Sequence, residues 1–88
     1  MAPDDAWRTL FLNWPDSIPR EGVVTTLLGE NVPFVGFARS PGLLLLERET
    51  PDALGQRKMI IPYSNIMTVK MGNPSSLQEL QPLGFKVK

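Results

Sequence analysis

The sequence predicts a small, mainly β domain: a strongly bent, five-stranded antiparallel barrel with a short N-terminal helix. Three observations predict it. An aromatic stripe with helical spacing lies near the N-terminus, short apolar and β-branched runs follow it as far as residue 71, and glycine, proline and asparagine separate those runs. We therefore expect one helix-plus-barrel domain over residues 1–71 and a C-terminal tail over residues 72–88.

The N-terminal helix is expected over residues 4–13. Its stripe has the spacing i, i+3, i+4 and i+7 and consists of Trp7, Leu10, Phe11 and Trp14. Pro15 ends the helix, because a proline disfavours helical geometry in the residue before it. We expect the stripe to pack on the core, and an exposed docking face is the alternative.

The first three strands are expected within residues 23–49. The first run covers residues 23–28 and ends in the turn Gly29-Glu30-Asn31, and the second covers Asn31 to Arg39. Because Pro33 and Gly36 interrupt the second run, they indicate an edge, a bulge or a sharp bend. The third run begins with four leucines at residue 43 and ends in charged residues at 47–49.

The last two strands are expected at Arg57–Ile61 and Ile66–Met71. The segment Pro62-Tyr63-Ser64-Asn65 lies between them and has the residue types of a turn. Both strands are apolar on both of their faces, so one face can enter the core while the other needs a cover.

Composition removes several classes of function. The chain has 88 residues, 42% of them hydrophobic, no net charge, and neither cysteine nor histidine. Thiolate and imidazole chemistry are therefore excluded, and we predict no catalytic residue, no metal site and no cofactor. The longest fully apolar run, Leu43–Leu46, is too short to cross a membrane, and we expect a cytoplasmic protein.

The pattern over residues 22–71 resembles the Sm-like (LSm and Hfq) family. The stretches "VVTTLLGENVPFVGFARSPGLLLL" and "LGQRKMIIPYSNIMTV" are similar to the two motifs of that family in length and spacing. The resemblance implies a small barrel whose fourth strand pairs with the fifth strand of the next subunit and closes a ring. Where the family holds a nucleic-acid base by an aspartate, an asparagine and a cation, this chain has Ala38, Gly42 and Pro62-Tyr63-Ser64.

The predicted function is therefore a non-catalytic assembly module that forms a homo-oligomer. The candidate interface residues are Met59, Ile60, Ile61, Ile66, Met67 and Val69. The alternative is an RNA-binding protein with an atypical pocket, for which the candidate residues are Arg57, Lys58, Tyr63 and Lys70. The C-terminal tail is expected to be loosely ordered, and a short docking segment for a protein partner is the alternative.

Overall fold

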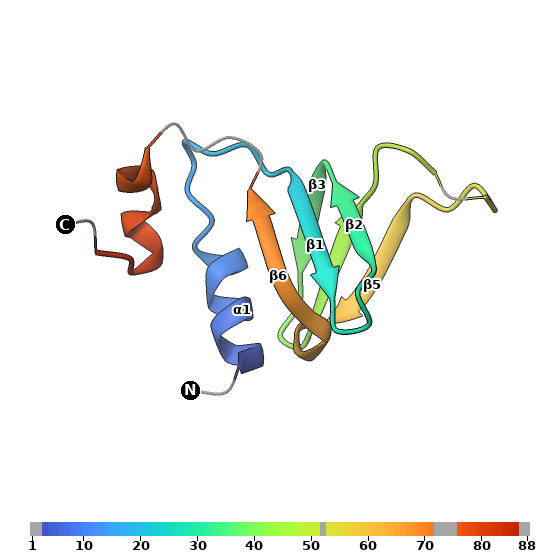
Figure 1. Cartoon of the computed structure of the whole chain (residues 1–88), viewed down its shortest axis with the longest axis horizontal. Helices are drawn as coiled ribbons and strands as arrows, with labels where there is room; N and C mark the ends of the chain where they lie inside the picture. Colours follow the sequence, from blue (N-terminus) through green and yellow to red (C-terminus); the bar gives the residue numbers. More distant parts are fainter. Residues whose placement is uncertain (1–2, 52, 72–75, 87–88) are drawn as a thin grey trace.

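The computed structural model describes residues 3–51, 53–71 and 76–86, and in these ranges it is a mainly β structure with a short N-terminal helix (Figure 1). The elements in chain order are α1 (Pro3–Leu12), β1 (Gly22–Thr26), β2 (Asn31–Phe34), β3 (Gly36–Arg39), β4 (Leu43–Glu47), β5 (Lys58–Pro62), the 3-10 helix η1 (Tyr63–Asn65), β6 (Ile66–Met71) and the 3-10 helix η2 (Leu77–Leu83). The predicted helix and the mainly β class are confirmed.

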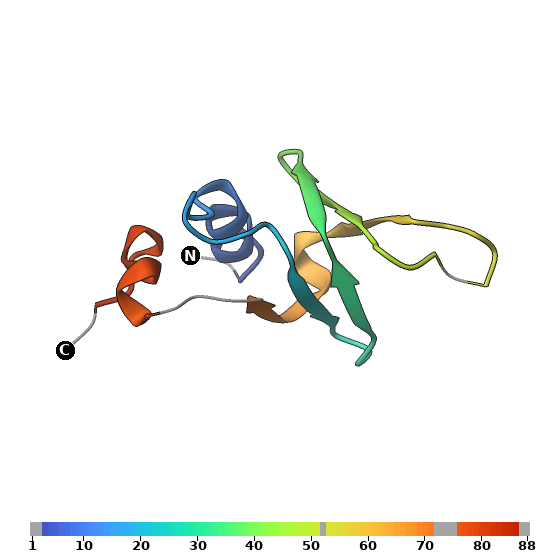
Figure 2. The same ribbon diagram turned by 90° about the horizontal axis from the view of Figure 1, so that it is seen from above.

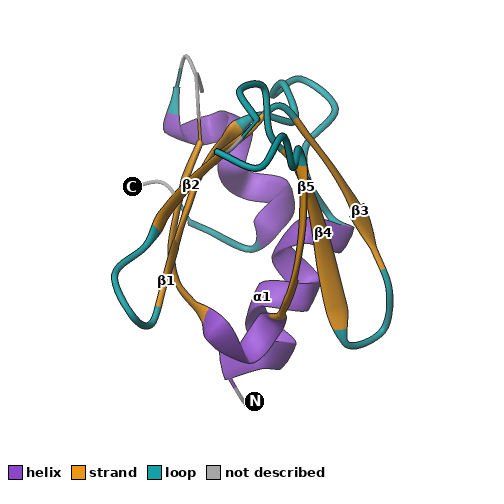
Figure 3. Cartoon of the chain, turned by 90° about the vertical axis from the view of Figure 1, so that its right-hand side faces the viewer, coloured by secondary structure: helices purple, strands orange, loops and turns teal. Residues whose placement is uncertain are grey.

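The strands form two antiparallel sheets of three, in the orders β2-β1-β6 and β3-β4-β5. β2 and β3 are the two parts of the predicted second strand, which breaks at Val35. The Val35 N–H donates to the Glu47 carbonyl at 2.8 Å, and beyond this point the chain pairs with β4 instead of β1. The predicted five-stranded barrel is therefore wrong in two respects: the bend makes six strands of five, and the strands form two separate three-stranded sheets instead of a closed barrel (Figure 3).

The core lies between the two sheets, and α1 lies across one end of that space (Figure 3). Four of its aromatic residues, Phe11, Trp14, Phe34 and Phe37, form one cluster, in which all ring centroids are 5.0–6.4 Å apart. The helix stripe thus packs on the core as expected. Burying one such side chain fully contributes about 1.5–3 kcal/mol, so α1 is fixed to the sheets mainly by this contact.

Two parts of the chain project from opposite ends of the molecule. The connection between β4 and β5 extends away from the sheets on one side, and η2 lies on the other (Figures 1 and 2). The molecule is accordingly elongated, with principal extents of 45 × 28 × 22 Å. η2 belongs to the predicted tail; its Leu80 packs against the core, while Leu77 is exposed.

No helix among the described residues is both long enough and apolar enough to span a membrane.

Candidate functional site

Two strand edges are open where the sequence predicts an interface. β5 is an outer strand of the sheet β3-β4-β5, and β6 is an outer strand of the sheet β2-β1-β6. η1 joins the two strands, which diverge from it (Figure 1). Because an edge strand presents a row of unpaired N–H and C=O groups, each of these edges can accept a further strand.

The predicted interface residues fall into three pairs. These are the buried pair Ile61 and Ile66, the half-buried pair Met59 and Val69, and the exposed pair Ile60 and Met67. The first four pack in or against the core of the single chain, so their side chains are already occupied. Ile60 is 63% exposed and Met67 is 54% exposed, and these two remain available to a second molecule.

Local geometry explains the outward position of both residues. Ile60 lies opposite Leu45 in the register, between two residues whose side chains turn to the core, as strand alternation requires. On β6 the register shifts: Thr25 pairs with Thr68 while Thr26 pairs with Ile66, which leaves Met67 without a partner on β1. This β-bulge turns the Met67 side chain out of the core.

The other two outer strands are less suited to accept a partner. β2 and β3 have four residues each, and Pro33 lies inside β2. Since proline has no N–H to donate, it interrupts the free edge, and its position agrees with the edge or bend that the sequence indicated. β6 has no proline and β5 has one only at its last position, so β5 and β6 are the more complete edges.

The basic candidates for RNA contact are exposed but are not gathered in one place. Lys58 begins β5 with Arg57 just before it, whereas Lys70 lies near the far end of β6. Because the two strands diverge from η1, these positions belong to different parts of the surface (Figure 1). The Lys58 ammonium also lies 3.8 Å from the carboxylate of Glu47, which offsets part of its charge.

Tyr63, the aromatic candidate for RNA contact, is 2% exposed and belongs to the core. Its hydroxyl donates to the carbonyl oxygen of Ser40 at 3.2 Å. Burial raises the pKa of Tyr63, and the nearby charges of Arg39 and Arg8 lower it by less. A base can stack on this ring only if η1 moves, so the structure gives Tyr63 a role in packing and in holding the β3–β4 turn.

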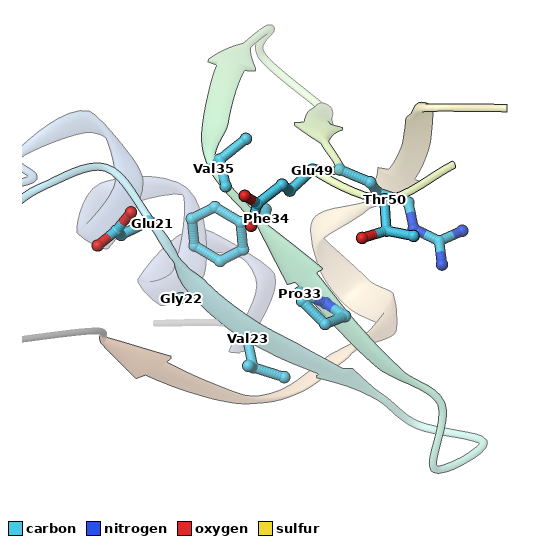
Figure 4. A pocket seen from close by; sticks show the side chains of 9 residues that line it. Glu21, Gly22, Val23, Pro33, Phe34, Val35, Glu49 and Thr50 are labelled. Carbon is cyan, nitrogen blue, oxygen red and sulfur yellow. The ribbon is translucent and has the colours of Figure 1, made fainter. Parts of the chain in front are cut away.

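A shallow hollow of about 310 Å³ lies beside the bend between β2 and β3 (Figure 4). Val23 and Pro33 line one part of it, and Glu49 and Thr50, beyond the end of β4, line another. Glu21 and Arg48 are also part of the lining. The lining mixes acids with a base and fits no single class of ligand, so we assign no function to it.

The described ranges contain no group of three or more acidic side chains close enough together to hold a metal ion.

Two residues near Tyr63 were not among the sequence candidates. Arg8 comes from α1 and Arg39 from the end of β3, and both line a second hollow with Tyr63. They lie far apart in the chain, and the packing of α1 against η1 together with the Arg8–Pro41 hydrogen bond places both beside the same hollow.

Comparison of the chain with models of protein families, with curated proteins and with solved structures gives no match.

Proposed function

We propose that this protein is a non-catalytic assembly module whose copies associate through the edge of β5 in one copy and the edge of β6 in the next. One observation carries the proposal. The two most complete open edges each hold a large exposed apolar residue, Ile60 on β5 and Met67 on β6.

The association would give these strands backbone hydrogen-bond partners and a cover for their exposed apolar side chains. Backbone pairing across the two edges would supply the missing hydrogen-bond partners, each worth about 1 kcal/mol net. The contact would also remove the side chains of Ile60 and Met67 from water, at about 25 cal/mol per Å² of apolar surface. Since the two edges belong to one chain and differ from each other, the contact is head to tail and can close into a ring.

The arrangement of strands also supports placing the chain among Sm-like proteins, as a divergent member. β1 pairs with β6, the bent run β2–β3 passes from one sheet to the other, and the short η1 separates the two edge strands. The absence of cysteine and histidine from the sequence and the exposed apolar edges both favour assembly over catalysis.

The test is the mass of the particle in solution, measured by size-exclusion chromatography with light scattering at micromolar concentration. We expect an oligomer, and we expect Ile60→Lys and Met67→Lys each to dissociate it. An unpaired charge in an apolar interface costs several kcal/mol, which is enough to dissociate the subunits.

Leu77→Lys is the matched control, because Leu77 is 69% exposed and lies on η2, not on either of the two edge strands. It should leave the oligomer intact. A wild-type chain that stays a soluble monomer would contradict the proposal, and so would an oligomer that is lost equally in all three variants. Circular dichroism of each variant shows that the chain is still folded.

A further inference from the structure

We propose that the hollow between α1, the β3–β4 turn and η1 binds a carboxylate group that is attached to an apolar body. The hollow measures about 330 Å³. Its lining residues are Arg8, Leu12, Arg39, Ser40, Pro41 and Tyr63. This inference does not depend on the proposed assembly.

The cationic part of the hollow consists of two guanidinium groups in different situations. Arg8 is held in place, because its Nη1 donates to the Pro41 carbonyl oxygen at 2.8 Å and its Nη2 contacts the carboxylate of Asp5. In the described part of the chain, the structure shows no hydrogen bond or ion pair of the Arg39 guanidinium. Arg39 therefore has its planar array of donors available, which matches the two oxygens of a carboxylate.

The charge of the site favours a single negative charge. Arg8 and Arg39 supply two positive charges, and the Asp5 carboxylate beside Arg8 supplies one negative charge, which leaves one positive charge. One carboxylate neutralises this net positive charge. A phosphate dianion would overcompensate it and lose more hydration on entering.

Both guanidiniums lie within electrostatic range of the Tyr63 hydroxyl. Both Arg39 and Arg8 act on this hydroxyl and lower its pKa, against the larger effect of burial, which raises it. The hydroxyl itself donates to the Ser40 carbonyl oxygen. An anion bound between the arginines would cancel their effect, so the pKa of Tyr63 should rise when the site is occupied.

The rest of the hollow is apolar. Leu12 is 60% exposed although it belongs to the helix that packs on the core, and Pro41 is part of the same lining. The Ser40 hydroxyl is already bonded to the backbone of Leu43, so it shapes the turn. The ligand should therefore carry an apolar group beside its carboxylate, as an aromatic organic acid or the free C-terminus of a peptide ending in leucine does.

The experiment is a titration of the full chain followed by NMR of the arginine Nε–H groups. The probes are benzoate, for a free organic acid, and N-acetyl-leucine, for a peptide end. Their uncharged counterparts are benzyl alcohol and N-acetyl-leucinamide, and inorganic phosphate tests for charge alone. We expect saturable shifts at Arg39 with one or both acids, and the tighter of the two identifies the source of the ligand.

Arg39→Gln should weaken binding of the better acid about fivefold or more, which corresponds to the loss of one exposed charged contact. Arg57→Gln is the control, since Arg57 is exposed and lies at the other end of β5 from η1. Because Tyr63 is the only tyrosine, its ionisation can also be followed by ultraviolet absorption, and its pKa should rise with the acid present.

Three results would overturn the inference. The uncharged counterparts could bind as well as the acids, phosphate could bind more tightly than both acids, or Arg39→Gln could leave the affinity unchanged. Each of these is independent of the particle mass, so failure of this site and failure of the proposed assembly are separate outcomes.

Discussion

Gly22, the first residue of β1, lies between two strands and has no room for a side chain. It pairs with Met71 on β6 and with Phe34 on β2. A Cβ added at Gly22 would overlap the carbonyl oxygen of Lys70 and would lie 3.2 Å from the Lys70 carbonyl carbon and 3.4 Å from the Met71 Cα. All three atoms belong to the backbone of β6, so no side-chain rotation can relieve the overlap.

The expected cost of Gly22→Ala follows from the only relief available, which is movement of the end of β6 away from β1. This movement gives up about one ladder hydrogen bond, worth about 1 kcal/mol. Residual overpacking adds about 1–2 kcal/mol. We therefore expect the free energy of unfolding to fall by about 2–3 kcal/mol, which lowers Tm by about 10 °C or more in a domain of this size.

Urea unfolding followed by tryptophan fluorescence, at one fixed protein concentration, measures this change. Gly42→Ala is the matched control. A Cβ at Gly42 has nothing within 4 Å, and Gly42 is not among the glycines with positive φ. That variant should be neutral or stabilising by about 0.5 kcal/mol, because alanine restricts the unfolded chain. Equal stability of Gly22→Ala and wild type would refute the reasoning, as would equal destabilisation by both changes.

The remaining predictions concern the pH dependence of stability that Tyr63 causes and the binding of RNA. Burial holds its folded-state pKa above that of the unfolded chain, so the stability that this group contributes is complete below pH 10 and is lost as pH rises through the folded pKa. Tyr63→Phe should remove this loss of stability at alkaline pH, and it should lower the free energy of unfolding by about 1 kcal/mol at neutral pH because the hydrogen bond to Ser40 is lost. Urea unfolding from pH 7 to pH 11 measures both effects. An unchanged alkaline loss in the variant would contradict the assignment to Tyr63. A salt titration with single-stranded RNA should show no binding at physiological salt, and micromolar binding that is lost in a folded Arg57→Ala variant would show instead that the basic residues contact phosphate.

Local signals in the sequence determined most of the secondary structure. The spacing of Trp7, Leu10 and Phe11 set the helix and the face it buries, and the structure ends α1 at Leu12, just before the proline signal. Gly29 marks a real turn, with φ of +87°. Each of these features depends on residues within a few positions of one another, which is why the sequence alone suffices.

Local patterns did not predict on which face the residues after the bend in the second run lie. The sequence indicated a bend near Gly36, but strict alternation along one continuous strand would put Phe37 on the other face from Val32 and Phe34. In the structure the break at Val35 resets the alternation, so Phe37 turns to the core beside Phe34 while Ala38 is exposed. Alternation predicts the face of a residue only while the strand is continuous.

Tertiary packing decided which of the apolar and charged residues remain available to contact a second molecule or a ligand. The sequence could name the interface candidates on β5 and β6, but only the packing between the sheets showed that Ile61 and Ile66 are buried in the core of the single chain. Ile60 and Met67 stay outside, the latter because of a bulge against β1. Likewise, Arg8 and Arg39 line one hollow because α1 packs on η1 and Arg8 bonds to Pro41 of the β3–β4 turn, which are contacts between segments far apart in the chain. Which residues meet across such a distance is set by how the sheets and the helix fill one common volume, and no local pattern of residues encodes that.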